Sequence, residues 1–462
     1  MTDKFANYFT LKNLENSFNS KVSKVSSKGI DKKSTENFKS DKANQLEVLE
    51  RKIKSGTFKF SPYLEILRVK NRESLPRLLS LPTIRDRIIL NITKDILHEE
   101  FKDSVNRELP NSYIRKIKKF LEKNKKAETI HFLKTDIKKF YDEVDRGILI
   151  KKLKKEVTDK SFLNLLKNAI ETPTVPSNYK KSDLSKYIVE KGIPQGLSIS
   201  NILAQIYLKE FDDYFRAELD SDLYLRYVDD IIIFSKSDCT KSLNSIKNKL
   251  AEIKLNINEE KTLSGNLEKQ IEFLGYSINR DNISVSNKAI ESQINKIAAK
   301  VTWFKKGISN PKARPGWMWN DEKAFKNAFI NEVNAIITGS KSAKKNYGWL
   351  FWYIEIDDLS VFYKMDSIIE SMFRTLKSFN GKPPKRLKKT VKAYFDIKYN
   401  KGGSYIKDYD KINTLSKKKK LLQDVAQVDP NKKYSDTEIF NKYENYRDRN
   451  LKNLERDIGY GY

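Results

Sequence analysis

The sequence has few of the residues that build disulfide-linked or zinc-binding proteins. It contains one cysteine, Cys239, and two histidines, His98 and His131, among 462 residues. A single cysteine excludes an intrachain disulfide and is typical of a reducing compartment. These three side chains are too few for a zinc site or an HNH-type nuclease. We therefore expect any catalytic metal to be bound by oxygen, which favours Mg²⁺ or Mn²⁺.

Long apolar runs are also missing. No stretch approaches the roughly 18 unbroken apolar residues of a transmembrane helix. The opening residues, MTDKFANYF, lack the apolar region of a secretory signal. We therefore expect no membrane partner and a cytoplasmic protein.

Acidic residues are in the minority. The chain has 61 Asp and Glu against 90 Lys and Arg, which gives a formal net charge of +29. An excess of this size indicates a polyanionic partner, because each phosphate that a cation neutralises releases condensed counterions. The length predicts two or three domains or subdomains. Residues 1–50 are polar and show little obvious core, and the pattern becomes mostly helical and basic from about residue 290.

One apolar segment is interrupted by two adjacent acids. Residues 223–234 read LYLRYVDDIIIF, and the runs on either side of Asp229 and Asp230 are typical of two strands joined by a hairpin turn. Such a turn prefers Asn-Gly or Asp-Gly, and neither is present. A turn that contradicts local preference indicates a functional site. The two carboxylates either form a solvated acidic turn or hold a divalent cation.

A third aspartate, Asp136, follows another strand-like segment, residues 129–135. If that strand lies beside the hairpin, the three carboxylates converge. Two divalent ions about 4 Å apart could then activate a 3′-hydroxyl and stabilise a leaving pyrophosphate. The upstream cations Lys70 and Arg77 either neutralise a triphosphate or are exposed surface charges.

A helix is predicted after residue 83. Thr83 and Asp86 have the spacing of a capping box at its start. Isoleucines at four-residue spacing should face a core. The opposite face carries Arg85 and Arg87, which we expect to be solvated or to contact nucleic acid.

Five motifs together carry a resemblance to a known family: KTDIKKFYD, GIPQGLSISNILAQIYL, YVDD, the turn at residues 258–261, and FLGYSI. Their order and spacing resemble the palm motifs of reverse transcriptases, and the segment that begins at Arg77 resembles their fingers. The resemblance covers roughly residues 25–280. It implies an α+β right-hand polymerase fold, with fingers and an antiparallel palm sheet, followed by a mostly α-helical thumb and C-terminal domain. It also implies an RNA-directed DNA polymerase that copies an RNA template into a DNA product from dNTPs.

The resemblance implies five segments along the chain. They are an N-terminal extension (1–50), fingers (51–128), a palm with the catalytic motifs (129–285), a helical thumb (286–380) and a basic helical C-terminal region with a tail (381–462).

Site residues follow from the same motifs. The resemblance implies that Asp136 and Asp229 bind both catalytic metals, that Asp230 completes the acidic cluster, and that Ile137 belongs to the metal site. The nucleotide-binding set is Lys70, Arg77, Phe140, Tyr141, Gln195 and Lys261. Within this set, Tyr141 matches the steric gate against a 2′-hydroxyl, Gln195 a residue near the template base, and Lys261 a lysine near the pyrophosphate. The primer and template set is Tyr227, Val228, Phe273, Leu274 and Gly275.

The branch of the family is indicated by smaller features. Residues 29–31 and LPTIRDRI resemble group II intron and related bacterial enzymes. Residues 197–201, ITG at 337–339 and YGWLFWYIEIDDLS from Tyr347 resemble the Abi-like, or unknown-group, reverse transcriptases of bacterial antiphage defence. The resemblance to the defence enzymes implies a bacterial cytoplasmic enzyme with a partner non-coding RNA. Whether the protein forms a homo-oligomer is left open.

Two alternatives accompany this interpretation, and the role of the C-terminal tail is also open. The chain could be a group II intron or retron reverse transcriptase of a mobile element, or a catalytically silent scaffold that binds RNA. The three intact aspartates argue against the scaffold. The tail could be an ordinary mobile terminus, or Tyr460 or Tyr462 could supply a hydroxyl that primes DNA synthesis.

Overall fold

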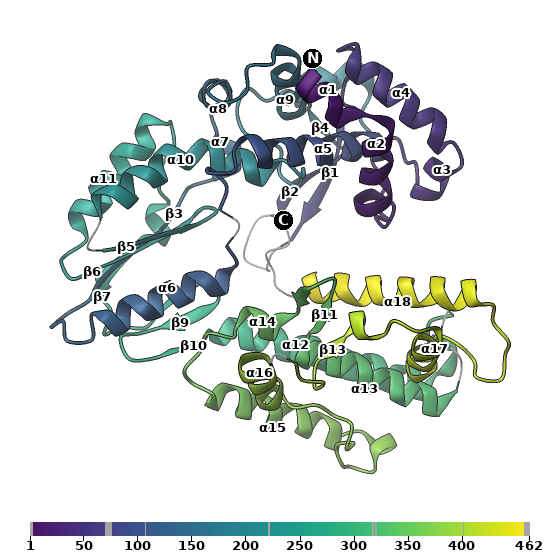
Figure 1. The fold of residues 1–462 in the computed structure, drawn as a ribbon. Coiled ribbons are helices and arrows are strands. Elements are labelled where there is room, and N and C mark those ends of the chain that lie inside the picture. Colours follow the sequence, from purple (N-terminus) through teal and green to yellow (C-terminus); the bar gives the residue numbers. More distant parts are fainter. Residues whose placement is uncertain are drawn as a thin grey trace. The chain divides into compact units, whose positions relative to one another are not determined.

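The computed structural model describes residues 3–69, 76–106, 108–219, 222–316, 318, 321–400 and 402–456. Lys70, Tyr460 and Tyr462 lie outside the described residues. The chain divides into two compact units (Figure 1). The first unit comprises Met1–Glu108 and Ala127–Asn266, and the second comprises Leu109–Lys126 and Leu267–Gly461.

The first unit combines helices with two small sheets. Its helices are α1 (Asp3–Ala6), α2 (Leu11–Ser17), α3 (Thr35–Lys39), α4 (Lys42–Lys54), α5 (Ile84–Glu100), α7 (Phe140–Glu143), α8 (Arg146–Leu153), α9 (Lys160–Glu171), α10 (Ser200–Glu218) and α11 (Thr240–Glu252). Its strands are β1 (Tyr63–Arg68), β2 (Arg77–Leu81), β3 (His131–Asp136), β4 (Thr174–Val175), β5 (Leu223–Tyr227), β6 (Asp230–Ser235) and β7 (Leu263–Asn266).

A four-stranded sheet in the order β5-β6-β3-β7 organises this unit, and all of its neighbouring strands are antiparallel. One of its two inner strands, β6, is fully buried from Ile231 to Phe234, which explains the unbroken apolar run in the sequence. Ile231 and Ile233 belong to the same core as apolar residues of α10 and α11, and these helices cover one face of the sheet (Figure 1). The antiparallel sheet with packed helices confirms the predicted α+β class.

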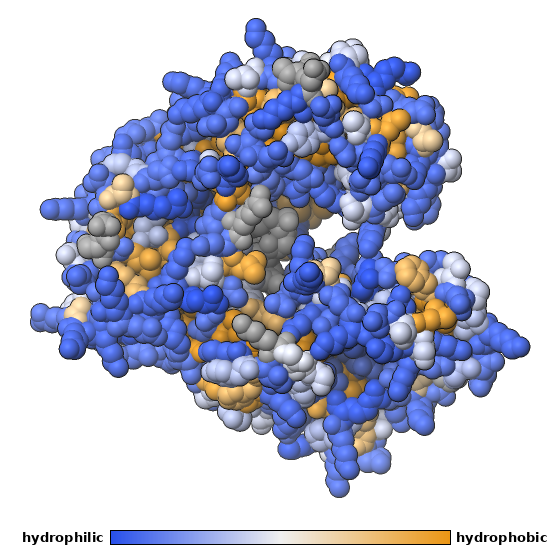
Figure 2. Space-filling view, viewed as in Figure 1, coloured by the Kyte–Doolittle hydropathy of each residue, from blue (hydrophilic) through white to orange (hydrophobic). Residues whose placement is uncertain are grey.

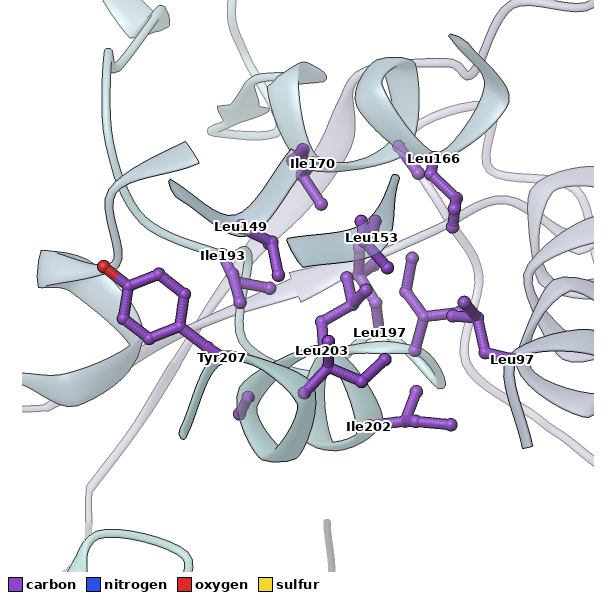
Figure 3. Packing of buried hydrophobic residues seen from close by; sticks show 14 of the residues in the cluster. Leu97, Leu149, Leu153, Leu166, Ile170, Ile193, Leu197, Ile202, Leu203 and Tyr207 are labelled. Atoms are coloured by element: carbon purple, nitrogen blue, oxygen red, sulfur yellow. The ribbon is translucent and has the colours of Figure 1, made fainter. Parts of the chain in front are cut away.

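Part of the core of the first unit lies where α8, α9 and α10 meet (Figure 3). Leu149 and Leu153 of α8 point toward Leu203 of α10, and Ile193 and Leu197 enter from the loop that precedes α10. This packing fixes the start of α10, and with it the loop that contains the Pro-Gln-Gly motif.

The expectation that residues 1–50 carry little core is wrong. Phe9, Leu14, Phe18 and Leu49 are fully buried and belong to the main core of the first unit. These apolar residues are widely spaced among polar ones: Leu14 lies on α2, Leu49 on α4, and Phe9 and Phe18 in the short helical turns on either side of α2. Gly29 also packs tightly, because a Cβ there would lie 2.7 Å from the Cα of Thr83.

The predicted capping box of α5 is confirmed. The backbone N–H of Asp86 donates to the Thr83 side chain, and the Thr83 hydroxyl donates to the Asp86 carboxylate at 2.7 Å. The expectation for Arg87 is wrong, because this side chain is buried and donates to the carbonyl and hydroxyl oxygens of Ser27. The N-terminal segment covers the helix face on which Arg87 lies.

The second unit is mostly helical, as predicted for the C-terminal part. Its helices are α6 (Pro110–Lys123), α12 (Asn287–Ser309), α13 (Glu322–Thr338), α14 (Trp349–Trp352), α15 (Ser360–Arg374), α16 (Thr390–Tyr399), α17 (Leu415–Asp424) and α18 (Asp436–Arg456). Its short strands are β8 (Ile271–Phe273), β9 (Tyr276–Ile278), β10 (Ile283–Val285), β11 (Ser340–Ser342), β12 (Lys345–Tyr347) and β13 (Lys407–Asp408). Helix α6 joins this unit through ion pairs of Arg115 with Glu355 and of Lys118 with Asp357.

Two motifs of the second unit meet at one hairpin. The ITG motif ends at Gly339, just before β11, and Gly348 follows β12. A Cβ on Gly339 would lie 2.3 Å from the Tyr347 carbonyl oxygen, and one on Gly348 would lie 2.7 Å from the Gly339 Cα. Glycine is therefore required at both positions for packing.

Hydrophilic residues cover most of the face seen in Figure 2. Among the helices of the described residues, none is long and apolar enough to cross a membrane.

The buried Asp86 carboxyl generates a stability prediction. Burial raises the pKa of Asp86 to about 6, although hydrogen bonds from Thr83 and Ser61 partly oppose the shift. The folded state therefore holds the proton more tightly than the unfolded chain, and this contribution to stability is lost as the pH rises from about 4 through about 6. The Asp86→Asn side chain stays neutral at every pH. The melting temperature of the variant should therefore rise relative to that of the wild type as the pH increases from about 4 to about 6.

The control for this comparison is Asp95→Asn on the same helix, where the side chain is half exposed and pairs with Lys21. Thermal unfolding of the three proteins at pH 4, 5, 6 and 7 makes the measurement. Equal pH dependence in the wild type and Asp86→Asn would contradict the assignment.

Candidate active site

The three aspartates lie at one end of the four-stranded sheet. Asp136 is the last residue of β3 and Asp230 the first of β6, and the strand register places them directly opposite each other. Residues paired in this way have Cα atoms about 4.5–5.5 Å apart. Asp229 occupies the turn before β6, and its carbonyl oxygen accepts a hydrogen bond from the Ile137 N–H at 3.0 Å. The backbone therefore brings all three acids to one place.

The turn between β5 and β6 is strained. Tyr227 pairs with Asp230, so only Val228 and Asp229 form the connection. Val228 has φ +58°, in the left-handed region that β-branched residues avoid. A backbone outlier of this kind costs about 1–3 kcal/mol and persists only where its surroundings impose it. The predicted hairpin is present, and it is built against local preference.

Burial and its acidic neighbours raise the proton affinity of Asp229. The pKa of Asp229 is raised to about 6, first by burial and then by the negative charges of Asp230 and Asp136. The positive charge of Arg77, the first residue of β2, partly offsets this shift. A bound cation would stabilise this cluster, because it would compensate the repulsion between the negative carboxylates.

Lys261 already provides one positive charge here. Its Nζ donates to Oδ2 of Asp136 at 2.8 Å, and the Asn258 N–H donates to the Asp136 carbonyl at 2.7 Å. Desolvation acts to lower the pKa of Lys261, but the hydrogen bond to Asp136 and the charges of all three aspartates raise it overall. The Lys261 side chain remains 64% exposed, so it can leave without disturbing the core.

The acids suit a hard divalent cation. Carboxylate oxygens are the ligands that Mg²⁺ prefers. As the side chains stand, no three His, Cys, Asp or Glu residues in the described part of the chain are grouped tightly enough to hold a metal. The strand register decides whether the three aspartates can share a cation. Rotation of the side chains can bring their carboxylates closer together, whereas a different register would place one of them on the other face of the sheet. Asp136, Asp229 and Asp230 are thus the residues that could bind the metal.

The residues predicted to contact the nucleotide cluster around α7 and the Pro-Gln-Gly loop. Phe140 and Tyr141 are buried at the start of α7. The loop docks there, because the Ile193 N–H donates to the Tyr141 carbonyl at 2.7 Å and Gln195 Nε2 donates to Oδ1 of Asp142 at 3.2 Å. The structure therefore brings Tyr141 and Gln195 together.

The same loop also joins β2. The Ser80 N–H donates to the Gln195 carbonyl at 2.7 Å. Gly196 has φ +100°, where a side chain would be strained, and a Cβ there would lie 3.2 Å from the Ser80 carbonyl oxygen. Glycine is therefore required after Gln195. Arg77 lies at the exposed start of the same strand, and its positive charge acts to lower the pKa of Asp229.

The primer and template set falls in both units. Tyr227 and Val228 flank the acidic turn in the first unit. Phe273, Leu274 and Gly275 form the β8–β9 hairpin of the second unit, where Leu274 and Gly275 both have positive φ. Their role at the primer stays a prediction.

Arg226 and Asp212 are residues that the sequence analysis missed. They form a buried ion pair between β5 and α10. The sequence does show Arg226 inside the apolar strand LYLRY and Asp212 on the largely apolar helix that precedes it. A buried charge needs a partner, so two such residues near one site predict a pair.

Comparisons with known proteins match the segment of the chain that contains the three aspartates. Residues 69–278 match the family described as reverse transcriptase (RNA-dependent DNA polymerase). The COX1/OXI3 intron 1 protein of Saccharomyces cerevisiae is 24% identical over 50% of this chain and 34% of its own length. Protein YkfC of Escherichia coli is 26% identical over 37% of this chain and 45% of its own length. The chain thus spans between about a third and a half of these curated relatives.

Solved structures with some similarity include telomerases. Apo telomerase from Candida tropicalis is 15% identical, with 84% of this chain and 68% of that chain covered and a TM-score of 0.40. Telomerase from Candida albicans in complex with a fragment of telomeric RNA is 12% identical, with 75% and 68% covered and a TM-score of 0.41. Scores of this size carry no argument about function.

The Lys261–Asp136 contact generates a prediction about metal binding. Lys261→Met removes the ammonium group that competes for Asp136, so Mn²⁺ should bind about two- to fivefold more tightly in the absence of nucleotide. This range corresponds to the roughly 0.4–1 kcal/mol of a mostly exposed ion pair. Titration followed by electron paramagnetic resonance of free Mn²⁺ measures the affinity. Lys247→Met, which removes an exposed pair with Glu259, is the control. Unchanged or weaker binding in Lys261→Met would contradict the competition.

Proposed function

We propose, from the premise that residues 69–278 form a reverse transcriptase domain, that this protein is an RNA-directed DNA polymerase. It extends DNA from dNTPs on an RNA template, by nucleotidyl transfer onto a 3′-hydroxyl or a protein side-chain hydroxyl. The observation that carries the proposal is the register of Asp136 opposite Asp230, with Asp229 in the adjoining turn.

The three aspartates would hold Mg²⁺, or Mn²⁺ in its place. When bound, two such ions supply activation of the attacking hydroxyl and stabilisation of the leaving pyrophosphate. The protein's own share of phosphoryl transfer is mostly positioning and charge. Arg77 and Lys261 would contribute the positive charge, because both act on the acidic cluster from adjacent segments.

Selection of the nucleotide would depend on the Pro-Gln-Gly loop and α7. Tyr141, packed against Phe140, is the candidate steric gate that favours deoxynucleotides. Gln195 is the candidate contact to the template base or incoming nucleotide, and its hydrogen bond with Asp142 fixes its orientation beside α7.

An RNA partner is supported by the charge distribution in the second unit. Residues 380–420 contain fourteen Lys and Arg against three Asp, which places a net charge of +11 in 41 residues of a chain whose total is +29. On α16 within this segment, Phe395 and Tyr399 are 43% and 69% exposed, and their rings stack at 5.9 Å. Exposed aromatic rings among cations are typical of surfaces that bind single-stranded nucleic acid.

The biological setting has two candidates. The sequence variant at residues 197–201 and the motifs around Gly339 and Tyr347 support a role in bacterial antiphage defence with a partner non-coding RNA. The alternative is a reverse transcriptase of a group II intron or a retron, and the similarity to yeast intron proteins supports the intron. Sequencing the nucleic acid that co-purifies with the protein separates them, since a defence enzyme would carry one small non-coding RNA and an intron enzyme its own intron.

The acidic turn gives the test of activity. Asp229→Ala combined with Asp230→Ala should reduce incorporation of labelled dNTPs below about 1% of wild type, because loss of one preorganised electrostatic group alone costs about 10²–10³-fold. Folding should be nearly intact, since these side chains serve the cation and not the core. Incorporation is measured with Mg²⁺ or Mn²⁺, on a primed RNA template and on co-purified RNA.

The control is Asp213→Ala, an exposed aspartate of α10 that pairs with Lys209. It should keep wild-type activity. A wild-type protein that incorporates no nucleotide under any of these conditions would leave the silent RNA-binding scaffold as the better account.

The basic segment gives a second prediction. Replacing the exposed lysines Lys417, Lys419 and Lys420 of α17 by Ser should weaken RNA binding and reduce the slope of log affinity against log salt by about 2, from about 0.7 per lost phosphate contact. Fluorescence anisotropy with a labelled single-stranded RNA at several salt concentrations makes the measurement. The matched control replaces three exposed lysines elsewhere in the same unit, Lys123, Lys125 and Lys126. Equal losses in both triple variants would show that only the overall charge matters.

A further inference from the structure

A buried ion pair lies directly behind the acidic turn. The side chains of Arg226 on β5 and Asp212 on α10 are 7% and 8% exposed. The Arg226 Nε donates to Oδ1 of Asp212 at 2.7 Å, and Nη2 donates to Oδ2, so the contact is bidentate. The Tyr224 hydroxyl donates to the same Oδ1 at 2.7 Å. The carboxylate is thus held by two side chains of one strand.

The guanidinium also reaches the turn itself. Arg226 Nη1 donates to the carbonyl oxygen of Val228 at 2.7 Å. This carbonyl belongs to the peptide that links Val228 to Asp229, and Val228 is the residue with positive φ. Arg226 therefore fixes the orientation of the peptide from which the Asp229 side chain departs.

The geometry of the guanidinium suits it to this task better than other cations. Its planar fork can bind a carboxylate with two N–H groups and still donate a third hydrogen bond in a defined direction. A buried ion pair is rarely more stabilising than well-packed apolar residues, so its presence at this position calls for another explanation. The explanation that the contacts support is that Asp212 orients Arg226 and Arg226 orients the turn.

The position of Asp212 also connects two parts of the site. Helix α10, which carries Asp212, begins just after the Pro-Gln-Gly loop. The Ser200 hydroxyl at its start donates to the Pro194 carbonyl at 2.6 Å. Helix α10 thus contacts two parts of the site. Its first residue binds the loop that contains Gln195, and Asp212, further along the helix, binds the Arg226 guanidinium.

We propose that Arg226, held by Asp212, is a positioning residue that sets the Val228–Asp229 peptide and thereby directs the Asp229 carboxylate toward Asp136 and Asp230. This inference rests on the proposed function, because it assigns Arg226 a task in the same acidic site. The proposal assigns Arg226 no direct contact with the substrate. Its consequence is that loss of the fork affects cation binding and turnover more than nucleotide affinity.

The principal variant is Arg226→Lys, which keeps the charge but cannot bind Asp212 twice and Val228 at once. We expect kcat for dNTP incorporation to fall about 10- to 100-fold, since small misplacement of a reacting group costs up to about 10²-fold. The KM for dNTP should change less than about threefold. The affinity for Mn²⁺, measured by electron paramagnetic resonance without nucleotide, should fall about five- to tenfold.

A graded variant protects the test from misfolding. Tyr224→Phe removes only the hydroxyl that holds Asp212 and preserves the ring that stacks on Phe215. It should give a smaller change in the same direction, about two- to fivefold in kcat and in Mn²⁺ affinity. If Arg226→Lys does not fold, this variant decides the proposal.

The matched control is Glu210→Gln, two residues before Asp212 on the same helix. Glu210 pairs with Lys152 and Lys155 and has no contact with the turn among its described bonds. It should lower the melting temperature without changing kcat or Mn²⁺ affinity.

A purely structural role for Arg226 predicts a different result. In that case Arg226→Lys and Tyr224→Phe would lower the melting temperature, as Glu210→Gln does, and leave kcat and Mn²⁺ affinity at wild-type values. That result would overturn the proposal. If the wild-type protein makes no DNA, the proposed function fails, and the Mn²⁺ affinities alone then decide whether Arg226 positions the acidic turn.

Discussion

The antiparallel pairing of β3 with β6 is the interaction on which the site depends. Its register places Asp136 opposite Asp230, and a slip of one residue would turn one of the two side chains to the other face of the sheet. The ends of the fully buried run from Ile231 to Phe234 favour this register, because a slip of one residue would move either the charged Asp230 or the small polar Ser235 into the place of a buried apolar side chain. The bond from the Ile137 N–H to the Asp229 carbonyl then extends the pairing into the turn.

The site is held in a state that the isolated chain would avoid. Three carboxylates share one end of a sheet, Asp229 is buried enough to gain proton affinity, and Val228 adopts a left-handed backbone. Each feature costs stability, and the surrounding core and the positive charge of Lys261 offset the cost, while Arg226 donates a hydrogen bond to the Val228 carbonyl. Strain and repulsion at one point of an otherwise consistent fold are typical of functional sites.

Local patterns predicted the hairpin, the capping box of α5, the helical second unit and the strand before Asp136. They failed where partners are distant in sequence. The buried phenylalanines of residues 1–50 stand singly among polar residues, and Arg87 finds its partner at Ser27, so neither signal is visible in a short window. The partners of α6 in the second unit are likewise some 240 positions away, so no local pattern links them. Asp212 and Arg226 were detectable only as charges in apolar surroundings.

The most direct test of the account is a crystal structure of the full chain soaked in Mn²⁺, with the ions located by anomalous scattering. The account predicts anomalous peaks within about 2–2.5 Å of carboxylate oxygens of Asp136 and Asp229, with Asp230 beside them. Peaks located elsewhere, or the carboxylate of Asp136 more than about a nanometre from those of Asp229 and Asp230, would contradict it, because no shared pair of ions could then span them.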